Sequence, residues 1–163
     1  SLFRYFETLR ELRQETLRRY FKRYDHLFQI PDITESTLEH RSQVFVNCRA
    51  KLYETTEPMC HQARRRAPDF PDLDEELHSV RAMQADQVRQ CFAYELEALS
   101  PSARDDLVAT INTLTSFESW DQIVHDHNRT PRQVRRTWTT ALHRLLQPPG
   151  YSNTGSTTEM VQK

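Results

Sequence analysis

The residue types able to ligate a metal ion are few and scattered in this chain. His125 and His127 lie close to Asp121, and Cys60 directly precedes His61. Two histidines at positions i and i+2 point to different sides of a helix, and Cys60-His61 has no partner at ligand spacing. Such spacings are more typical of histidines at a surface or a helix end. The sequence therefore predicts no metal site and no cofactor.

The residues needed for catalysis form no local pattern either. The nearest approach to a Glu-x-x-His ligand pair is Glu57 with His61, which has the wrong spacing. Cys48, Cys60 and Cys91 form no CxxC motif, and an odd number of cysteines gives no disulfide framework. A reducing cytoplasm is then the expected location, and nothing in the sequence argues for an enzyme.

Three consecutive arginines at positions 64–66 raise the question of nucleic-acid binding. On a helix they spread over much of its circumference, and at a carboxyl end they interact favourably with the helix dipole. We interpret them as a solvated helix terminus rather than as phosphate contacts.

Glycine is the most informative residue type for the fold. The 163 residues include only Gly150 and Gly155. Tight hairpins, phosphate-binding loops and dinucleotide-binding turns rely on glycine at positive φ, so Rossmann and P-loop proteins are excluded and an all-α fold is predicted. No apolar stretch is long enough to span a membrane, and no membrane partner is expected.

Apolar residues at spacings of three and four predict the helices that must position any site. The first is expected to begin at a capping box of Thr8 and Glu11 and to stop before Pro31. Thr34 or Ser36 is expected to cap the second helix.

Prolines and hydroxyl residues predict the later boundaries. The second helix is expected to break near residues 55–57, where Pro58 can begin a shorter helix. The longest helix is expected over residues 73–99. Ser100 then caps the next helix, and Thr130 opens the last one with a capping box.

The first eight residues contain hydroxyl, aliphatic and aromatic side chains in a specific order, together with one arginine and one glutamate. They resemble the end of the recognition helix of tetracycline-repressor-like (TetR family) regulators at Ser1, Leu2, Phe3, Tyr5, Phe6 and Thr8. Phe3 and Leu9 stand where that family usually has a tyrosine and a lysine. The resemblance implies that residues of this segment contact DNA. The hydroxyls of Ser1, Tyr5 and Thr8 would face phosphates, and Arg4 would lie near the groove.

The carboxyl-terminal part is similar to the same family. Residues 114–121, an interrupted helix and the capped segment 130–146 resemble the last two, dimer-forming helices of many TetR-like proteins. The resemblance covers residues 1 to about 147.

The resemblance and the composition together imply a division of the chain into three parts. In it, residues 1–8 are the remnant of a helix-turn-helix DNA-binding domain and residues 9–147 a ligand-binding and dimerisation domain, while the polar composition of the end of the chain, which holds both glycines, predicts a flexible tail over residues 148–163. The earlier part of the helix-turn-helix is expected upstream of Ser1, so operator DNA is a partner only when that domain is complete. The implied function is a bacterial, ligand-responsive transcriptional regulator, usually a repressor. It acts as a homodimer in which the effector shifts the first long helix.

The last helix carries an apolar stripe that the resemblance places against a second copy of the chain. The expected dimer interface consists of Trp120, Val134, Trp138, Leu142 and Leu145. The alternative is that Trp138 belongs to the core of its own chain, as aromatic stripes often do.

In TetR-like proteins the effector pocket lies among the middle helices. The candidate lining residues are Phe45, Cys48, Met83, Gln87, Cys91 and Tyr94. The last four follow helical spacings of four, four and three. A buried amide such as that of Gln87 costs free energy unless it is paired, so this stripe predicts an apolar cavity for a small apolar effector. In the alternative interpretation Gln87 faces solvent and the others are ordinary core.

Two other classes of protein fit the same helices. A helical protein–protein interaction adaptor would bind partners through exposed stripes and would have neither an internal pocket nor an operator. A helical-bundle enzyme is disfavoured because its inward-facing ligand pairs are not evident.

Overall fold

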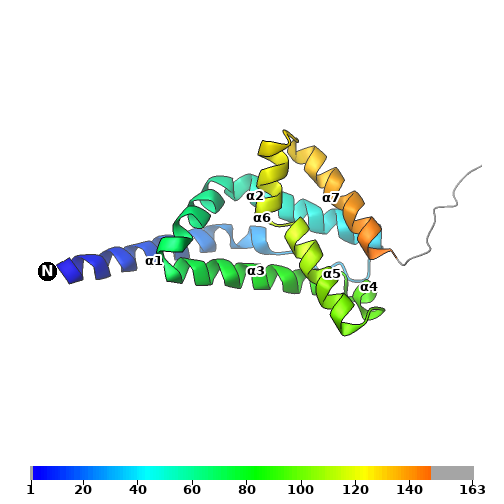
Figure 1. Cartoon of the computed structure of the whole chain (residues 1–163), viewed down its shortest axis with the longest axis horizontal. Coiled ribbons are helices and arrows are strands. Elements are labelled where there is room, and N and C mark those ends of the chain that lie inside the picture. Colours follow the sequence, from blue (N-terminus) through cyan, green and yellow to red (C-terminus); the bar gives the residue numbers. More distant parts are fainter. Residues whose placement is uncertain (1, 148–163) are drawn as a thin grey trace, which may run out of the picture.

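The computed structural model describes residues 2–147, and within residues 2–21 it describes the side chains of residues 4, 11–13, 15, 16, 19 and 20 only. The described part is all-α, with helices and no strand. None of its helices combines the length and the apolar character needed to cross a membrane. The amino-terminal part of α1 projects beyond a body built from the other helices (Figure 1).

α1 is one continuous helix from Leu2–Phe28. The expected start at a capping box of Thr8 and Glu11 is wrong. Residues 2–8 contain neither glycine nor proline, so the helix continues through Thr8 and its backbone N–H groups need no side-chain cap. The expected stop is confirmed, because α1 ends at Phe28, before Pro31.

α2 spans Leu38–Arg66, and neither of the two expected caps, Thr34 and Ser36, is its cap. Its cap is Thr37, whose hydroxyl accepts a hydrogen bond from the His40 N–H at 3.2 Å. The expected cap Thr34 instead donates its hydroxyl and N–H to Asp32.

α2 also runs through Pro58 without the expected break at residues 55–57. A proline inside a helix removes one backbone hydrogen bond and costs about 3 kcal/mol. Packing holds the helix together on both sides of it, because Tyr53, Thr56 and Ala63 are all buried. Tertiary contacts therefore outweigh the local preference for a break.

The predicted helix over residues 73–99 is two helices. After the short turn η1 (Ala67–Asp69), α3 spans Pro71–Cys91 and α4 spans Ala93–Glu97, with Phe92 between them at φ −120° and ψ 26°. No glycine or proline marks this break.

The break is stabilised by side chains from α2. Phe92 is fully buried and packs edge-on against Phe45, with ring centroids 5.4 Å apart. The Arg41 guanidinium donates to the Cys91 carbonyl at 2.8 Å and so satisfies an acceptor at the end of α3.

Two of the remaining helices, α5 and α7, begin at the predicted caps. α5 spans Pro101–Leu114 with Ser100 as its cap, α6 spans Phe117–Asp121, and η2, a π-helical turn, spans Gln122–Asp126. α7 spans Pro131–Leu146, and its capping box of Thr130 and Gln133 is confirmed.

The apolar face of α7 packs into the core of its own chain. Val134, Trp138 and Leu142 are 0% exposed and Trp120 is 1% exposed, with the two tryptophan ring centroids 6.1 Å apart. A side chain without accessible surface contacts no partner while its protomer is folded. The expected placement of these four in a dimer interface is therefore wrong, and the core alternative for Trp138 is right. Leu145, 39% exposed, is the member of that set that remains accessible.

Candidate functional site

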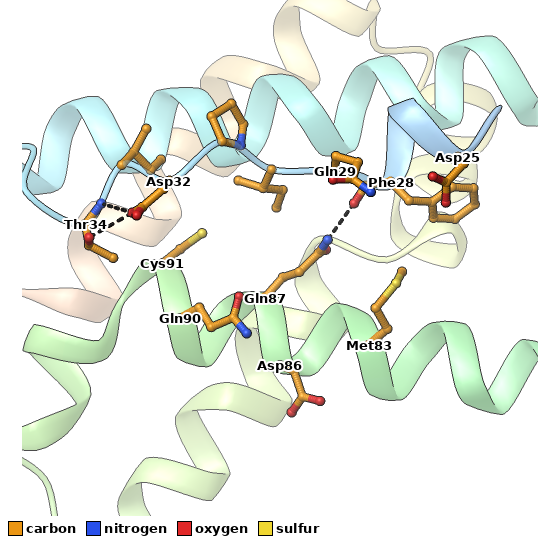
Figure 2. Close-up of a pocket in the computed structure, with 13 residues that line it drawn as sticks. Asp25, Phe28, Gln29, Asp32, Thr34, Met83, Asp86, Gln87, Gln90 and Cys91 are labelled. Carbon is orange, nitrogen blue, oxygen red and sulfur yellow. Dashed lines mark hydrogen bonds between the residues drawn. The ribbon is translucent and has the colours of Figure 1, made fainter.

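A groove lies between the end of α1, the linker of residues 29–34 and one face of α3 (Figure 2). We call it the α1–α3 groove. Its volume is about 670 Å³, which is within the range of small-molecule sites. It is lined by Asp25, Phe28, Gln29, Ile30, Pro31, Asp32, Ile33, Thr34, Met83, Asp86, Gln87, Gln90 and Cys91.

The linker is held in place by a local turn. The N–H and the hydroxyl of Thr34 donate to Oδ1 of Asp32 at 3.2 and 2.9 Å (Figure 2), and the Ile33 carbonyl accepts from the Ser36 N–H at 3.0 Å. Asp side chains favour such turns because they bond to the backbone two residues further on. The hydrogen bonds from Thr34 also lower the pKa of Asp32, so its carboxylate is charged at neutral pH.

Gln87 connects α3 to the end of α1. Its Nε2 donates to the Phe28 carbonyl across the groove (Figure 2). This bond fixes the amide plane, and Oε1 of the same amide is buried without a hydrogen-bond partner among the described residues. A buried acceptor without a partner costs about 1–3 kcal/mol. A ligand that donates a hydrogen bond to this oxygen would remove that cost.

The charged residues of the groove are all acidic. Asp25 lies in the last turn of α1, Asp32 in the linker and Asp86 on α3, and no lysine, arginine or histidine is among the lining residues. Asp86 is paired with Arg89 at 2.9 Å. The groove therefore favours ligands that carry positive charge or N–H donors.

Three of the six predicted pocket residues line the groove, namely Met83, Gln87 and Cys91. The other three do not. Phe45 is fully buried in the core, Cys48 is half-buried on α2, and Tyr94 is 80% exposed. Tyr94 leaves the stripe because α3 ends at Cys91, and the spacing of three across the break no longer keeps the two residues on one face.

The two cysteines from the predicted set are neutral thiols. Burial raises the pKa of Cys91 to about 11 and also raises the pKa of Cys48. The thiolate is the form that attacks electrophiles and binds metal ions. Cys91 therefore contributes a small apolar surface to the groove.

Of the predicted DNA contacts, Arg4, Tyr5 and Thr8 belong to α1, and the Arg4 side chain is exposed. Ser1 and the side chains of Tyr5 and Thr8 lie outside the described residues.

The candidate histidines have neighbours that sequence spacing did not indicate. His61, for which no ligand partner was found, has Nε2 3.1 Å from Oδ1 of Asp121 on another helix. His125 and His127 are both exposed, and His125 contacts Glu57 of α2, with Nε2 2.6 Å from Oε1. In the sequence, Glu57 stands near His61 and Asp121 near His125, but each segment was considered alone. The contacts that join the two segments, His61 to Asp121 and His125 to Glu57, were missed.

The linker side of the groove was also missed by sequence reasoning. The signal was available in part, because Pro31 cannot continue α1 and biases Ile30 away from the helical conformation. Comparison with known proteins adds no further guidance, since no protein-family model, no curated protein and no solved structure matches this chain.

Proposed function

We propose that this chain is the regulatory region of a TetR-like, ligand-responsive transcriptional regulator whose effector binds in the α1–α3 groove. The observation that carries the proposal is Gln87, which bonds the end of α1 and leaves an oriented acceptor unpaired in the groove wall. The DNA-binding part of the proposal comes from the resemblance of residues 1–8 and 114–146 to that family.

The groove offers a physical route from ligand to helix position. One wall consists of the last turn of α1 and the other of α3, so a ligand that fills the groove contacts both. A ligand shifts a conformational equilibrium only by its difference in affinity for the two states. An effector in the groove favours the position of α1 in which Asp25, Phe28 and Gln87 contact it together. The resulting shift of the end of α1 would move the rest of that helix.

The groove supports a different effector from the apolar one that the sequence indicated. Asp25 and Asp32 provide negative charge near its two ends, and Phe28, Ile30 and Met83 provide apolar surface between them. We infer an effector that combines a protonated amine with an apolar body. Its amine would bond a carboxylate, and an N–H or O–H group would reach Oε1 of Gln87.

The experiment uses the complete gene product that contains this chain. Operator DNA is first selected from a random duplex library, and the bound complex is then screened for release by a set of amphiphilic amines and by their uncharged amide analogues. We expect a selected operator, and release by amines but not by the amides. Failure to select any operator would exclude the regulator and favour the helical adaptor. Release by uncharged compounds only would retain the regulator and reject the cationic effector.

A further inference from the structure

Two segments of the chain each carry a carboxylate and a histidine that are separated by one helical turn. Glu57 and His61 are at positions i and i+4 of α2, and their Oε1 and Nε2 atoms are 4.0 Å apart. Asp121, at the end of α6, and His125, in the π turn η2, repeat this spacing with Oδ1 and Nε2 3.7 Å apart. Side chains at i and i+4 point to the same side of a helix, so each segment presents one carboxylate and one imidazole together.

The two pairs face each other in a crossed arrangement. The His125 Nε2 lies 2.6 Å from Oε1 of Glu57, and the His61 Nε2 lies 3.1 Å from Oδ1 of Asp121. All four donor atoms lie within 4.8 Å of one another. Tetrahedral Zn²⁺ with bonds of about 2.0–2.1 Å places its ligand atoms about 3.3 Å apart. The four measured separations lie on both sides of that value, so shifts of less than about 1 Å would close the shell.

Two buried aromatic residues contact the side chains of the cluster and orient them. The Trp120 indole N–H donates to Oε2 of Glu57 at 3.3 Å, which leaves Oε1 directed at the two histidines. The His61 ring packs edge-on against Phe117, with centroids 5.1 Å apart. Trp120 and Phe117 are 1% and 2% exposed. Hydrogen bonds to ligating carboxylates orient and tune metal sites in this way.

The backbone at His125 is itself unusual. α6 continues directly into η2, whose π-helical turn spans Gln122–Asp126. Single π turns inside helices are rare and occur frequently at functional sites. Here the turn carries His125 at the position where it meets Glu57.

We propose that Glu57, His61, Asp121 and His125 bind one divalent transition-metal ion of the Zn²⁺ class. Imidazole nitrogen suits Zn²⁺, Ni²⁺, Cu²⁺ and Fe²⁺, whereas an all-oxygen shell would favour Mg²⁺ or Ca²⁺. None of the four residues lines the α1–α3 groove, so the site is separate from the proposed effector site.

The ion would act as a cross-link between α2 and the α6–η2 segment. Four protein ligands close a tetrahedral shell, which is typical of structural zinc sites, whereas catalytic sites keep one position for water or substrate. The ligands come from two segments that are 60 residues or more apart in sequence, so the folded chain holds the shell and an unfolded chain does not. Metal binding therefore stabilises the fold and most strongly restrains η2.

The test uses the untagged 163-residue chain, stripped with a chelator and titrated with Zn²⁺ alone. We expect one ion per chain by calorimetry, a rise in the thermal midpoint and slower amide exchange over residues 122–126. His61→Gln and His125→Gln should each weaken Zn²⁺ binding at least about tenfold, since losing even an outer partner of a metal site costs about 10–100-fold. Co²⁺ should give the intense visible bands of a tetrahedral site, and both variants should lose them.

The matched control is another carboxylate–histidine pair of the same spacing on one helix. Asp74 and His78 of α3 are i and i+4, with Oδ1 and Nδ1 3.7 Å apart, and among the side chains that the structure describes they belong to no group of three or more possible ligands. His78→Gln should leave Zn²⁺ affinity unchanged. Equal weakening in His78→Gln, or unchanged binding in both His61→Gln and His125→Gln, would overturn the proposal.

Loss of folding in a histidine variant is tested separately. The helical content of each variant is measured without metal, and Asp121→Asn, which keeps the side-chain shape, replaces any variant that has lost helix. If Asp121→Asn folds and still binds Zn²⁺ as tightly as the wild type, the four-ligand site is wrong.

Discussion

Arg41 and Glu95 form a two-pronged ion pair that is almost entirely buried. Nη1 of Arg41 lies 2.7 Å from Oε2 of Glu95, and Nη2 lies 2.6 Å from Oε1. The arginine side chain is 6% exposed and the glutamate side chain 10%. The hydrogen bond to Glu95 raises the pKa of Arg41 further above its ordinary value. The pair ties the first turn of α2 to α4, just beyond the break at Phe92.

Removing the charge of Glu95 should therefore be strongly destabilising. In Glu95→Gln the Arg41 guanidinium stays buried without a counter-charge, and breaking such a pair costs about 3–5 kcal/mol. Urea denaturation followed by circular dichroism measures the loss. Asp86→Asn is the control, because its pair with Arg89 is exposed and should contribute less than about 1 kcal/mol. Equal losses in both variants would contradict this account.

Trp138→Ala tests the placement of the α7 stripe. Because Trp138 is fully buried among Tyr53 and Trp120, its truncation should lower the free energy of unfolding by about 3–5 kcal/mol. The loss arises inside one chain, so it should not depend on protein concentration in the denaturation experiment. A loss that disappears at high concentration would restore the interface assignment.

Homodimerisation itself remains a prediction, and Leu145 is the residue with which to test it. Leu145→Asp places a charge on an accessible position of α7. If α7 contacts a second copy there, sedimentation should detect a larger monomer fraction in the variant than in the wild type, with stability of the single chain little changed. An identical distribution of species would place any interface elsewhere.

Glu118 makes the acid stability of the chain predictable. Burial by itself would raise its pKa, but hydrogen bonds from Arg64 and Arg81, at 2.7 and 2.8 Å, outweigh this and lower the pKa to about 2. A carboxylate whose pKa is lowered by folding stabilises the fold at every pH above its ordinary pKa of 4.5. This contribution is lost as the pH falls from 4.5 toward 2.

Acid titration of Glu118→Gln isolates this contribution. The wild type should lose stability between about pH 4.5 and 2, and the variant should be less stable at neutral pH and show a shallower loss in that window. Thermal midpoints measured at half-unit pH steps give both curves. Parallel curves would mean that Glu118 does not determine the slope.

Gln87→Leu tests the coupling between groove and α1. The variant loses the hydrogen bond to the Phe28 carbonyl and the unpaired acceptor together. We expect release of operator DNA by the effector to be abolished or to need at least about tenfold more effector, since a lost polar contact of about 1.4 kcal/mol has that effect. Gln43→Leu, an exposed amide on α2 away from the groove, is the control. An unchanged effector response in Gln87→Leu would remove this residue from the site.

Local signals in the sequence were sufficient for several element boundaries. Pro31 marks the end of α1, and Ser100 and Thr130 cap α5 and α7, because each of these residues acts on backbone groups within three or four positions. The absence of glycine before Gly150 predicted the all-α class, because glycine also acts locally, by allowing the tight turns that hairpins need.

Features determined by distant residues were not predictable in this way. The break at Phe92 depends on Arg41, and the continuity of α2 through Pro58 depends on packing along its whole length. The four-residue cluster was missed because the partner of His61 is Asp121, 60 positions away. In the groove, the residues of the α3 wall could be predicted from their helical spacing. The residues of the linker wall could not, because only the folded chain places them beside α3.

The unbroken course of α1 has a mechanical consequence. Its 27 residues, at a rise of about 1.5 Å each, make a rod about 40 Å long. The rod contacts the body at Arg13, whose guanidinium lies 4.5 Å from the centre of the Phe70 ring, and again at Leu27 and Phe28, which pack against the core. The part of α1 before Arg13 is therefore a lever about 16 Å long, and a tilt of the rod by about 5° moves its far end by about 1.4 Å relative to that contact.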